Sequence, residues 1–338
     1  MEQYNFNNLT ELIKYTEDYK RRRKRQRTSY GSHTLRRLEA IEGPEIPYNV
    51  DMERLSYSIE PLKKLNDLVG MDSIKKNIID QILFYSQDLN TNEMMHTCIT
   101  GPPGVGKTTI CKILAELYCS LGFLKTDNFR VVGRSVLKGG YLGQTAIKTK
   151  KVLKECLNGV IFIDEIYSLG SGKESDSDSY SKECIDTINQ FLSENTKNFV
   201  MIIAGYREEV DRCFFSMNPG LRRRFPWNYN IEKYTPDNLS DIFRYQVREN
   251  GWKFEESINS GDFLKKLFTE YTIFENNGGD TLSLFDKCKI CHSRRVFGKK
   301  RRYKMVLNET DIRLAVELLK SNKISNAKNK QPPYGMYV

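Results

Sequence analysis

The sequence predicts an α/β fold in which a five-stranded parallel sheet lies between helices and a smaller helical domain follows. Three observations lead to this prediction. Short apolar runs, typical of strands buried on both faces of a parallel sheet, begin near residues 97, 129, 160, 199 and 228. Segments with apolar residues at helical spacing separate several of these runs. After residue 232 only helical patterns remain, so the second domain is expected to be helical.

These patterns divide the chain into four parts. Residues 1–60 are an N-terminal extension of weak periodicity with a basic arm, and residues 61–232 are the α/β core. Residues 233–322 form the helical lid, and residues 323–338, which show no apolar period, form a flexible tail. The length of 338 residues and the hydrophobic content of 39% suit a globular protein with two cores.

The run Gly101–Thr109 fits the phosphate-binding pattern G-x-x-x-x-G-K-[ST] without a gap. In this pattern the backbone N–H groups of the loop surround the phosphates, Lys107 reaches the β and γ oxygens, and the Thr108 hydroxyl binds Mg²⁺. Apolar residues at helical spacing follow, so the phosphates would lie at a helix N-terminus. The expected nucleotide ligands are Pro102, Pro103, Gly104, Val105, Gly106, Lys107, Thr108 and Thr109.

Two carboxylates, Asp164 and Glu165, come directly after the apolar run 159–163. Ligands of open parallel sheets bind at the carboxyl ends of the strands. We expect Asp164 to hold the Mg²⁺ ion through water and Glu165 to polarise the attacking water. Together with the phosphate loop, the pair predicts an enzyme that hydrolyses a nucleoside triphosphate with Mg²⁺.

Four segments, read in order, resemble the AAA+ ATPases and, within them, the CbxX/CfxQ group. They are GPPGVGKT at 101–108, GYLGQT at 140–145, VIFIDEIYSL at 160–169 and IIAGYREEVDRCFFSMNPGLRRRF at 202–225. The resemblance covers roughly residues 61–320, and the last segment is its most specific part. It implies a P-loop NTPase core with a C-terminal helical lid, built into a homo-hexameric ring with the nucleotide at each subunit junction.

The resemblance also assigns roles to single residues. Arg224 matches the arginine that completes the neighbouring subunit's site, with Arg222 as the second candidate. Val69 and Gly70 match the turn whose backbone contacts the adenine. Tyr206 stands where many AAA+ proteins carry a polar γ-phosphate sensor, which leaves open whether it senses the phosphate.

Two further positions of the resemblance concern the lid and the substrate. Gly279 lies at the start of a helix that resembles the lid helix over the base and ribose. Tyr141, flanked by glycines in Gly140–Gly143, matches the aromatic residue with which similar remodelling ATPases hold a polypeptide in the central pore. A turn residue packed on the sheet is the alternative for Tyr141. The polar run Ser171–Ser181 is expected to be an exposed loop.

The net charge of +10 is concentrated in residues 287–338, which carry 14 basic and 3 acidic side chains. Residues 287–304 carry nine basic side chains and no acidic one, which suits a nucleic acid, an acidic protein or a solvated face. Residues 20–27 form a second basic cluster, either a nuclear-localisation element or a disordered arm.

Other sequence features concern location. The polar start, Met1–Leu12, argues against a secretory signal, and no apolar run approaches the ~20 residues needed to span a bilayer. We therefore expect a cytoplasmic or nuclear protein with no membrane partner, and free thiols among its eight cysteines.

The predicted function is an ATPase that remodels a protein substrate not named by the sequence. Two alternatives stay open. A nucleic-acid motor or loader would use the basic segments, and a nucleotide-dependent assembly scaffold would hydrolyse ATP slowly.

Overall fold

The computed structural model describes residues 8–29, 50–87, 89, 93–126, 128–139, 143–170, 179–259 and 261–328. The chain forms two units. The first contains Met1–Gly101 and Gly106–Ile231, and the second contains Pro102–Val105 and Glu232–Val338. The segment Pro102–Val105 lies in the middle of the phosphate loop. Its contacts place it in the second unit, together with the C-terminal residues.

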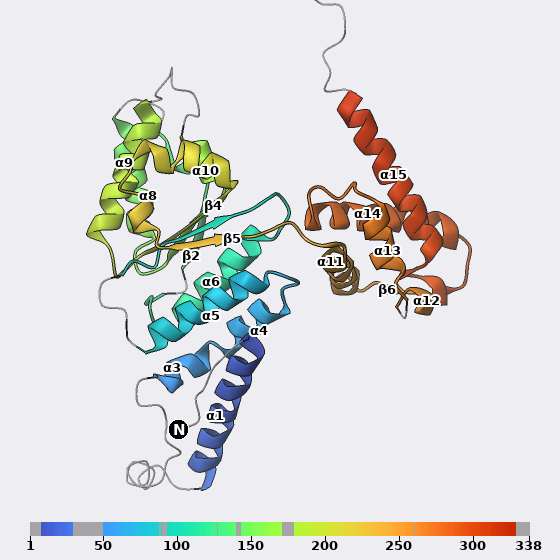
Figure 1. Ribbon diagram of the computed structural model, residues 1–338, viewed down its shortest axis with the longest axis horizontal. Helices are drawn as coiled ribbons and strands as arrows, with labels where there is room; N and C mark the ends of the chain where they lie inside the picture. Colours follow the sequence, from blue (N-terminus) through green and yellow to red (C-terminus); the bar gives the residue numbers. More distant parts are fainter. Residues whose placement is uncertain are drawn as a thin grey trace, which may run out of the picture. The chain divides into compact units, whose positions relative to one another are not determined.

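A five-stranded parallel sheet forms the centre of the first unit, as predicted (Figure 1). Its strand order is β2-β3-β4-β1-β5. The strands are β1 (Thr97–Thr100), β2 (Phe129–Val132), β3 (Val160–Ile163), β4 (Val200–Gly205) and β5 (Trp227–Asn230). All residues of β3 and β4 are buried, which is why these two runs are apolar throughout.

Helices cover both faces of this sheet (Figure 1). On one face lie α5 (Asp72–Ser86) and α6 (Lys107–Ser120), and on the other lie α8 (Gln144–Glu155), α9 (Ser179–Glu194) and α10 (Arg207–Cys213). Short α7 (Arg134–Leu137) packs on α8, and the 3₁₀ turns η1 (Ile166–Leu169), η2 (Phe215–Met217) and η3 (Arg222–Arg224) complete this unit. The side chains of α8, α9 and α10 and of the sheet form one continuous core.

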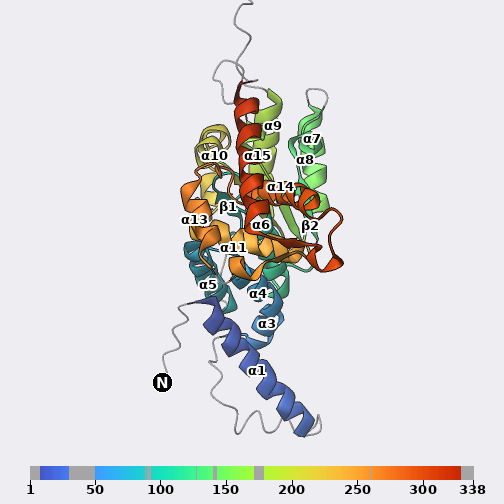
Figure 2. The ribbon, with the colours of Figure 1, turned by 90° about the vertical axis from the view of Figure 1, so that its right-hand side faces the viewer.

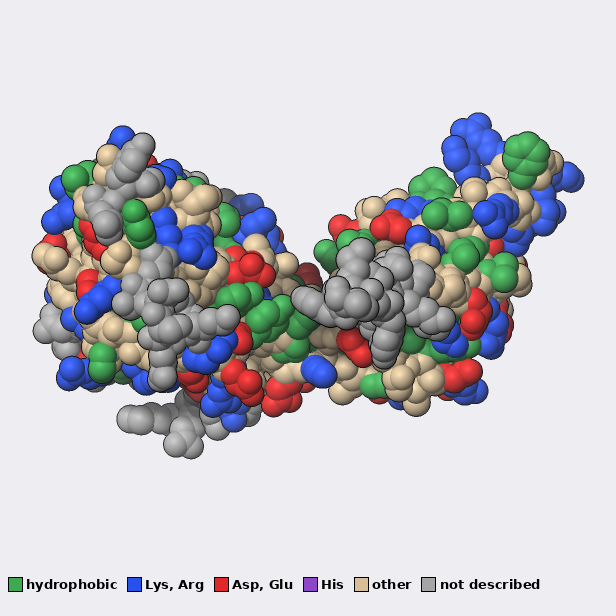
Figure 3. All heavy atoms as spheres, turned by 90° about the horizontal axis from the view of Figure 1, so that it is seen from above, with side chains coloured by type: hydrophobic (Ala, Val, Ile, Leu, Met, Phe, Trp, Pro, Cys, Tyr) green, Lys and Arg blue, Asp and Glu red, His purple; other side chains and the backbone are tan. Residues whose placement is uncertain are grey.

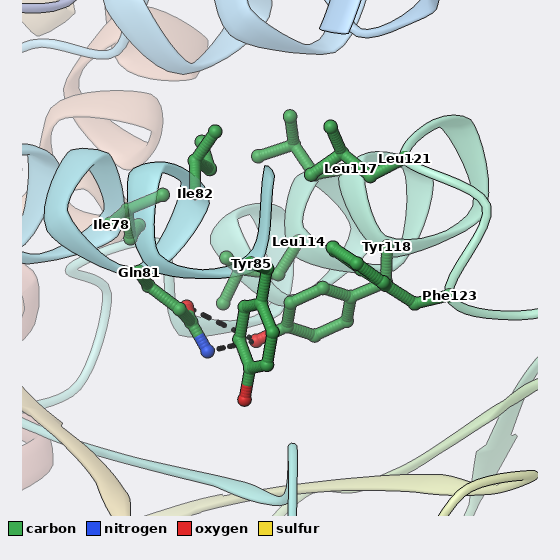
Figure 4. Close-up of a pocket in the computed structure, with 9 residues that line it drawn as sticks. All are labelled: Ile78, Gln81, Ile82, Tyr85, Leu114, Leu117, Tyr118, Leu121 and Phe123. Atoms are coloured by element: carbon green, nitrogen blue, oxygen red, sulfur yellow. Dashed lines mark hydrogen bonds between the residues drawn. The ribbon is translucent and has the colours of Figure 1, made fainter. Parts of the chain in front are cut away.

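The α5–α6 face contains a buried polar network. The Gln81 amide donates to the Tyr118 hydroxyl at 3.0 Å and accepts from the Tyr229 hydroxyl at 2.7 Å. The apolar space around it, lined by α5, α6 and Phe123 (Figure 4), has no room for a water-sized ligand. Because each polar atom of the network has a partner, we assign this region to the core and not to a binding site.

The N-terminal extension is more ordered than its sequence predicts. Residues 9–29 form the helix α1 (Leu9–Ser29), which packs on α3 (Met52–Tyr57) and α4 (Ile59–Asp67) (Figures 1 and 2). Leu9, Leu12 and Ile13 are buried there, and Lys63 pairs with Glu17 at 2.8 Å. The disordered-arm alternative for residues 20–27 is therefore wrong, since this cluster continues α1. The few apolar residues at the start of α1 gave too weak a period to reveal a helix.

The second unit is mainly helical, as expected. Its helices are α11 (Pro236–Glu249), α12 (Glu256–Asn259), α13 (Phe263–Glu270), α14 (Gly278–Val296) and α15 (Glu309–Lys328), with a 3₁₀ turn η4 (Arg301–Tyr303). A two-stranded parallel sheet of β6 (Lys253–Phe254) and β7 (Val306–Leu307) was not predicted, because each strand has only two residues. The boundary of the predicted tail at residue 323 is wrong, since α15 continues to Lys328.

A buried ionic cluster joins α14 to α15. The Arg295 guanidinium donates to both carboxylate oxygens of Asp311 at 2.8 Å, and His292 Nδ1 lies 3.1 Å from Asp311 Oδ2. The Asp311 side chain is 1% exposed. Burial alone would raise the pKa of Asp311, but the hydrogen bonds from Arg295 and His292 lower it below its ordinary value.

None of the helices in the described ranges has the length and apolar character needed to cross a bilayer.

Candidate nucleotide-binding site

The phosphate loop connects β1 to the N-terminus of α6, as its pattern requires. Gly104 and Gly106 have φ angles of 71° and 86°, in the left-handed region that favours glycine. A Cβ atom on Gly104 would lie 1.9 Å from the Asn276 carbonyl oxygen. Lys107 Nζ donates to the Gly101 carbonyl at 3.0 Å. The loop therefore has the tight, glycine-dependent path of a phosphate cradle.

Three residues of the second unit hold Pro102–Val105. The Asn277 side-chain amide donates to the Pro103 carbonyl at 3.0 Å, and the Gly278 amide donates to the Gly104 carbonyl at 3.0 Å. The Tyr234 hydroxyl donates to the Val105 carbonyl at 2.8 Å. Asn277 and Tyr234 were not predicted from the sequence, because neither belongs to a spacing pattern. Gly279, the predicted lid contact, lies in the first turn of α14 and is exposed.

The predicted magnesium ligands are adjacent. The Thr108 hydroxyl, in the first turn of α6, donates to Asp164 Oδ2 at 3.1 Å, directly after β3. Hydroxyl and carboxylate oxygens are the donors that Mg²⁺ prefers, so this pair fits the ion. Glu165 follows with a φ angle of 50°, and its amide donates to Asp164 Oδ1 at 2.9 Å. A non-glycine residue with such a φ is strained, and strained residues cluster at functional sites.

The environment of Lys107 fits an anionic ligand. Lys107 is partly buried, and this burial lowers the pKa of its ammonium, against the opposing charges of Asp164 and Glu165. Burial makes the charged ammonium of Lys107 less stable, and an anion bound beside it would stabilise that charge again. Two further residues of the loop differ in exposure. Val105 is fully buried, whereas Thr109, in the first turn of α6, is exposed.

An aromatic pair borders Lys107. The rings of Tyr167 and Tyr206 stack with centroids 5.6 Å apart, and Lys107 Nζ lies 5.2 Å from the Tyr206 centroid. A Cβ atom on Gly205 would lie 2.9 Å from the Tyr167 ring, so the ring packs on the bare backbone of β4. Burial and a hydrogen bond with Glu165 raise the pKa of Tyr167. Tyr167 was not predicted as a site residue, whereas Tyr206 was predicted as the sensor candidate.

The structure distinguishes the two finger candidates. Arg222 pairs with Asp211 at 2.7 Å and lies over the Phe215 ring. Arg224, by contrast, donates to the Ser193 hydroxyl and, at 2.6 Å, to the Gly220 carbonyl. Within the described part of the chain, no carboxylate forms an ion pair with Arg224. Among the described residues, the charge of Arg222 is thus paired with a carboxylate, whereas that of Arg224 is not.

The remaining predicted residues are placed only in part. Val69 and Gly70 lie in the loop between α4 and α5, where Lys75 Nζ donates to the carbonyls of Asn66 and Leu68 at 3.0 and 2.5 Å. The left-handed φ of 66° at Gly70 gives this loop a sharp turn. Tyr141 and most of the run Ser171–Ser181 lie outside the described residues, although α9 begins at Ser179.

A parallel sheet in this order, a glycine-rich loop that leads into a helix, and a hydroxyl–carboxylate pair beside it define a P-loop ATPase. The model of the ATPase family associated with various cellular activities (AAA) matches residues 97–232. The CfxQ homolog of Pyropia yezoensis is 30% identical over 283 residues, which cover 79% of this chain and 90% of that protein. The chain therefore belongs to the CbxX/CfxQ group of AAA+ ATPases, a family that uses ATP with Mg²⁺.

Other relatives match over a smaller part of their length. A putative cfxQ-like protein of Acanthamoeba polyphaga mimivirus is 42% identical over 73% of this chain and 61% of its own. The stage V sporulation protein K of Bacillus subtilis is 34% identical over 57% of this chain and 62% of its own. This chain thus spans about three fifths of these two relatives. A crystal structure of the FIGL-1 AAA domain in complex with ADP has the same fold, with a TM-score of 0.56, 18% identity, and coverage of 78% of this chain and 88% of that one.

Proposed function

We propose that this protein assembles into a homo-hexameric ring and couples hydrolysis of Mg-ATP to the remodelling of a protein substrate in the central pore. Lys107 would bind the β and γ phosphates, Thr108 and Asp164 would hold Mg²⁺, and Glu165 would polarise the attacking water. Arg224 would act on the nucleotide of the next subunit. The family relationship supports hydrolysis, and the residue-by-residue match of Tyr141 supports the pore.

The main observation in support of the ring is the set of partners of Arg224. It is held in place by Ser193 and Gly220, yet among the described residues it has no acidic partner that would neutralise it. An arginine positioned without a carboxylate suits a phosphate supplied from outside its own subunit. An arginine finger contributes about 10³ to 10⁵ in rate, so its removal should be easy to detect.

Mixing two inactive variants tests this proposal. Glu165→Gln should bind ATP but lose about 10² to 10⁴ in turnover, since a positioned acid or base supplies that much. Arg224→Ala should also be inactive, because each nucleotide then lacks the arginine from the neighbouring subunit. In mixed rings some junctions receive Glu165 from one subunit and Arg224 from the other, so turnover should partly recover. If the mixture shows only the average of the two separate proteins, Arg224 does not act across a junction.

A neighbouring arginine provides the control. Arg223 is exposed in the same 3₁₀ turn, and Arg223→Ala should retain turnover close to that of the unmodified protein. The mass of the Glu165→Gln protein with ATP, measured by native mass spectrometry, should correspond to six chains. A monomer at all concentrations would contradict the ring.

The pore role is tested at Tyr141. A photo-crosslinking residue at position 141 in the Glu165→Gln protein, held with ATP, should crosslink to a polypeptide. Crosslinks to nucleic acid would instead favour the motor or loader alternative. Tyr141→Ala, without the photo-crosslinking residue, should retain basal ATP hydrolysis but lose the remodelling of the crosslinked polypeptide. Normal cellular function of Tyr141→Ala would favour the assembly scaffold.

A further inference from the structure

The segment 294–304, which joins α14 to β7, forms a basic surface that the nucleotide site does not use. We name it the basic loop. It contains seven Lys and Arg residues and no Asp or Glu. Figure 3 shows Lys and Arg side chains gathered near an exposed hydrophobic side chain at one end of the second unit. The basic loop thus combines many cations with an exposed apolar side chain.

The basic loop is anchored at both ends. Arg295 donates to Asp311 at 2.8 Å and to the Val306 carbonyl at 2.9 Å, which ties the end of α14 to β7. Backbone hydrogen bonds from Lys299 to Val296 (2.9 Å) and from Lys304 to Arg301 (3.0 Å) fix the turns between them. The side chains of the basic loop therefore project from an ordered backbone. A ligand that binds them would not have to offset the cost of ordering this backbone.

Two flat side-chain groups project from this loop. Phe297 is 91% exposed. The Arg302 guanidinium lies 4.9 Å from the Tyr303 ring centroid, and Nη2 of Arg302 donates to the Tyr303 hydroxyl at 2.9 Å. An aromatic ring and a guanidinium plane are the surfaces on which nucleic-acid bases stack.

The cations around these planes have no carboxylate partner among the described residues. Across the described ranges, no carboxylate forms an ion pair with Lys299, Lys300, Arg301, Arg302 or Lys304. Lys289, nearby on α14, is instead neutralised by Asp286 at 2.7 Å. The basic loop thus presents unneutralised charge to an anionic partner.

We propose that the basic loop binds single-stranded nucleic acid, with its Lys and Arg side chains on the phosphates and Phe297 stacked on a base. An acidic peptide would neutralise the cations but leave the exposed ring without a matching group. A duplex would bury its bases and offer no face to Phe297. This inference does not rest on the remodelling function, because the basic loop contains none of the residues assigned to ATP hydrolysis.

Fluorescence anisotropy of a labelled deoxythymidine or uridine oligonucleotide with the full chain tests the proposal. The affinity should fall with salt, because for single strands log K changes with log salt by about −0.7 per phosphate contacted. The triple variant Lys300→Gln, Arg301→Gln, Arg302→Gln should make this slope shallower by about 2. Phe297→Ser should weaken binding by about 5- to 100-fold at every salt concentration without changing the slope, since it removes stacking and no charge.

Matched controls come from other exposed residues. The triple variant Lys150→Gln, Lys151→Gln, Lys154→Gln on α8 removes the same charge and should leave the slope unchanged. Tyr245→Ser removes another exposed aromatic, 51% exposed, and should leave the affinity unchanged. All variants should keep the thermal midpoint and the basal ATP hydrolysis of the unmodified protein, because the changed side chains are exposed.

Three results would overturn the proposal. The first is equal oligonucleotide binding by the unmodified protein and both basic-loop variants. The second is binding of polyglutamate but not of the oligonucleotides, which would identify an acidic protein as the partner. The third is binding only of vesicles containing phosphatidylserine, which would identify an anionic membrane surface.

Discussion

The Tyr167 ring stacks on the Tyr206 ring at a centroid distance of 5.6 Å, with an angle of 23° between the planes. Lys107 Nζ lies 5.2 Å from the centroid of the Tyr206 ring. Tyr206→Ala should remove both contacts and lower kcat/KM by roughly 10-fold, since an aromatic pair and a cation–π contact each contribute about 0.5 to 1.5 kcal/mol. Tyr206→Phe keeps both contacts and should stay within about 2-fold of the unmodified enzyme by the same energies. Steady-state ATP hydrolysis measures both.

The Phe variant separates two roles of Tyr206. If Tyr206→Phe is as impaired as Tyr206→Ala, then the hydroxyl and not the ring contributes, which would support direct sensing of the γ-phosphate. Tyr57, 62% exposed, gives the control, because Tyr57→Phe removes a hydroxyl from the same unit without touching the site.

Gly104→Ala should abolish tight ATP binding. Its Cβ would lie 1.9 Å from the Asn276 carbonyl oxygen, and the φ of 71° adds strain. Gly122 has a similar φ of 74°, but its nearest atom would be Arg54 Nε at 3.7 Å. Gly122→Ala should therefore cost only about 1 kcal/mol of stability from the backbone and leave ATP affinity unchanged. Titration with a fluorescent ATP analogue compares the two, and equal affinities would show that the loop adapts its path.

His96 should make the first unit sensitive to acid. Burial, with a smaller effect from the Arg224 charge, lowers the pKa of His96 to about 3, and its Nδ1 accepts a hydrogen bond from the Met201 amide at 3.1 Å. Between the folded pKa and the unfolded value near 6.5, the unfolded chain binds one more proton, so the free energy of unfolding decreases as the pH falls. The loss between pH 6.5 and pH 5 should be about 2 kcal/mol.

Urea unfolding of His96→Gln measures this contribution. The variant keeps a polar side chain but cannot be protonated, so its free energy of unfolding should change less between pH 6.5 and pH 5. If the free energy of unfolding changed equally with pH in the two proteins, then His96 would be protonated in the folded state.

Asp311→Asn should destabilise the second unit by about 3 kcal/mol, because it leaves the Arg295 charge without its buried partner. The control Asp286→Asn breaks an exposed pair with Lys289 and should cost less than about 0.5 kcal/mol. Hydrogen exchange of the α14 and α15 amides reports the difference. Since the folded pKa of Asp311 is lowered, its stabilisation is present at neutral pH and is lost as the pH falls below about 4.

The fold and the centre of the site could be predicted because both depend on local patterns. Buried parallel strands require continuous apolar runs, so β3 and β4 were evident from composition alone. The phosphate loop and Asp164 are fixed by chain order, which places them at one edge of the sheet. The 3.1 Å contact between Thr108 and Asp164 is the direct result of that order.

The residues that were missed act through contacts distant in sequence. Asn277 binds the carbonyl of Pro103, which is 174 residues away in the sequence. No spacing rule connects the two residues. Tyr167 lies in the segment 160–169 that carries the family resemblance, but no spacing pattern connects it with Tyr206 or with the bare backbone of Gly205. The helix α1 was missed for another reason, because its buried apolar residues lie in its first two turns and its second half is mostly basic.

The hydrogen bonds on Pro102–Val105 have a mechanical consequence. Asn277, Gly278 and Tyr234 each bind one carbonyl of this short segment, and Gly278 begins α14. A segment held at three successive carbonyls cannot shift alone. Any shift of this segment on nucleotide binding would therefore move the start of α14 with it.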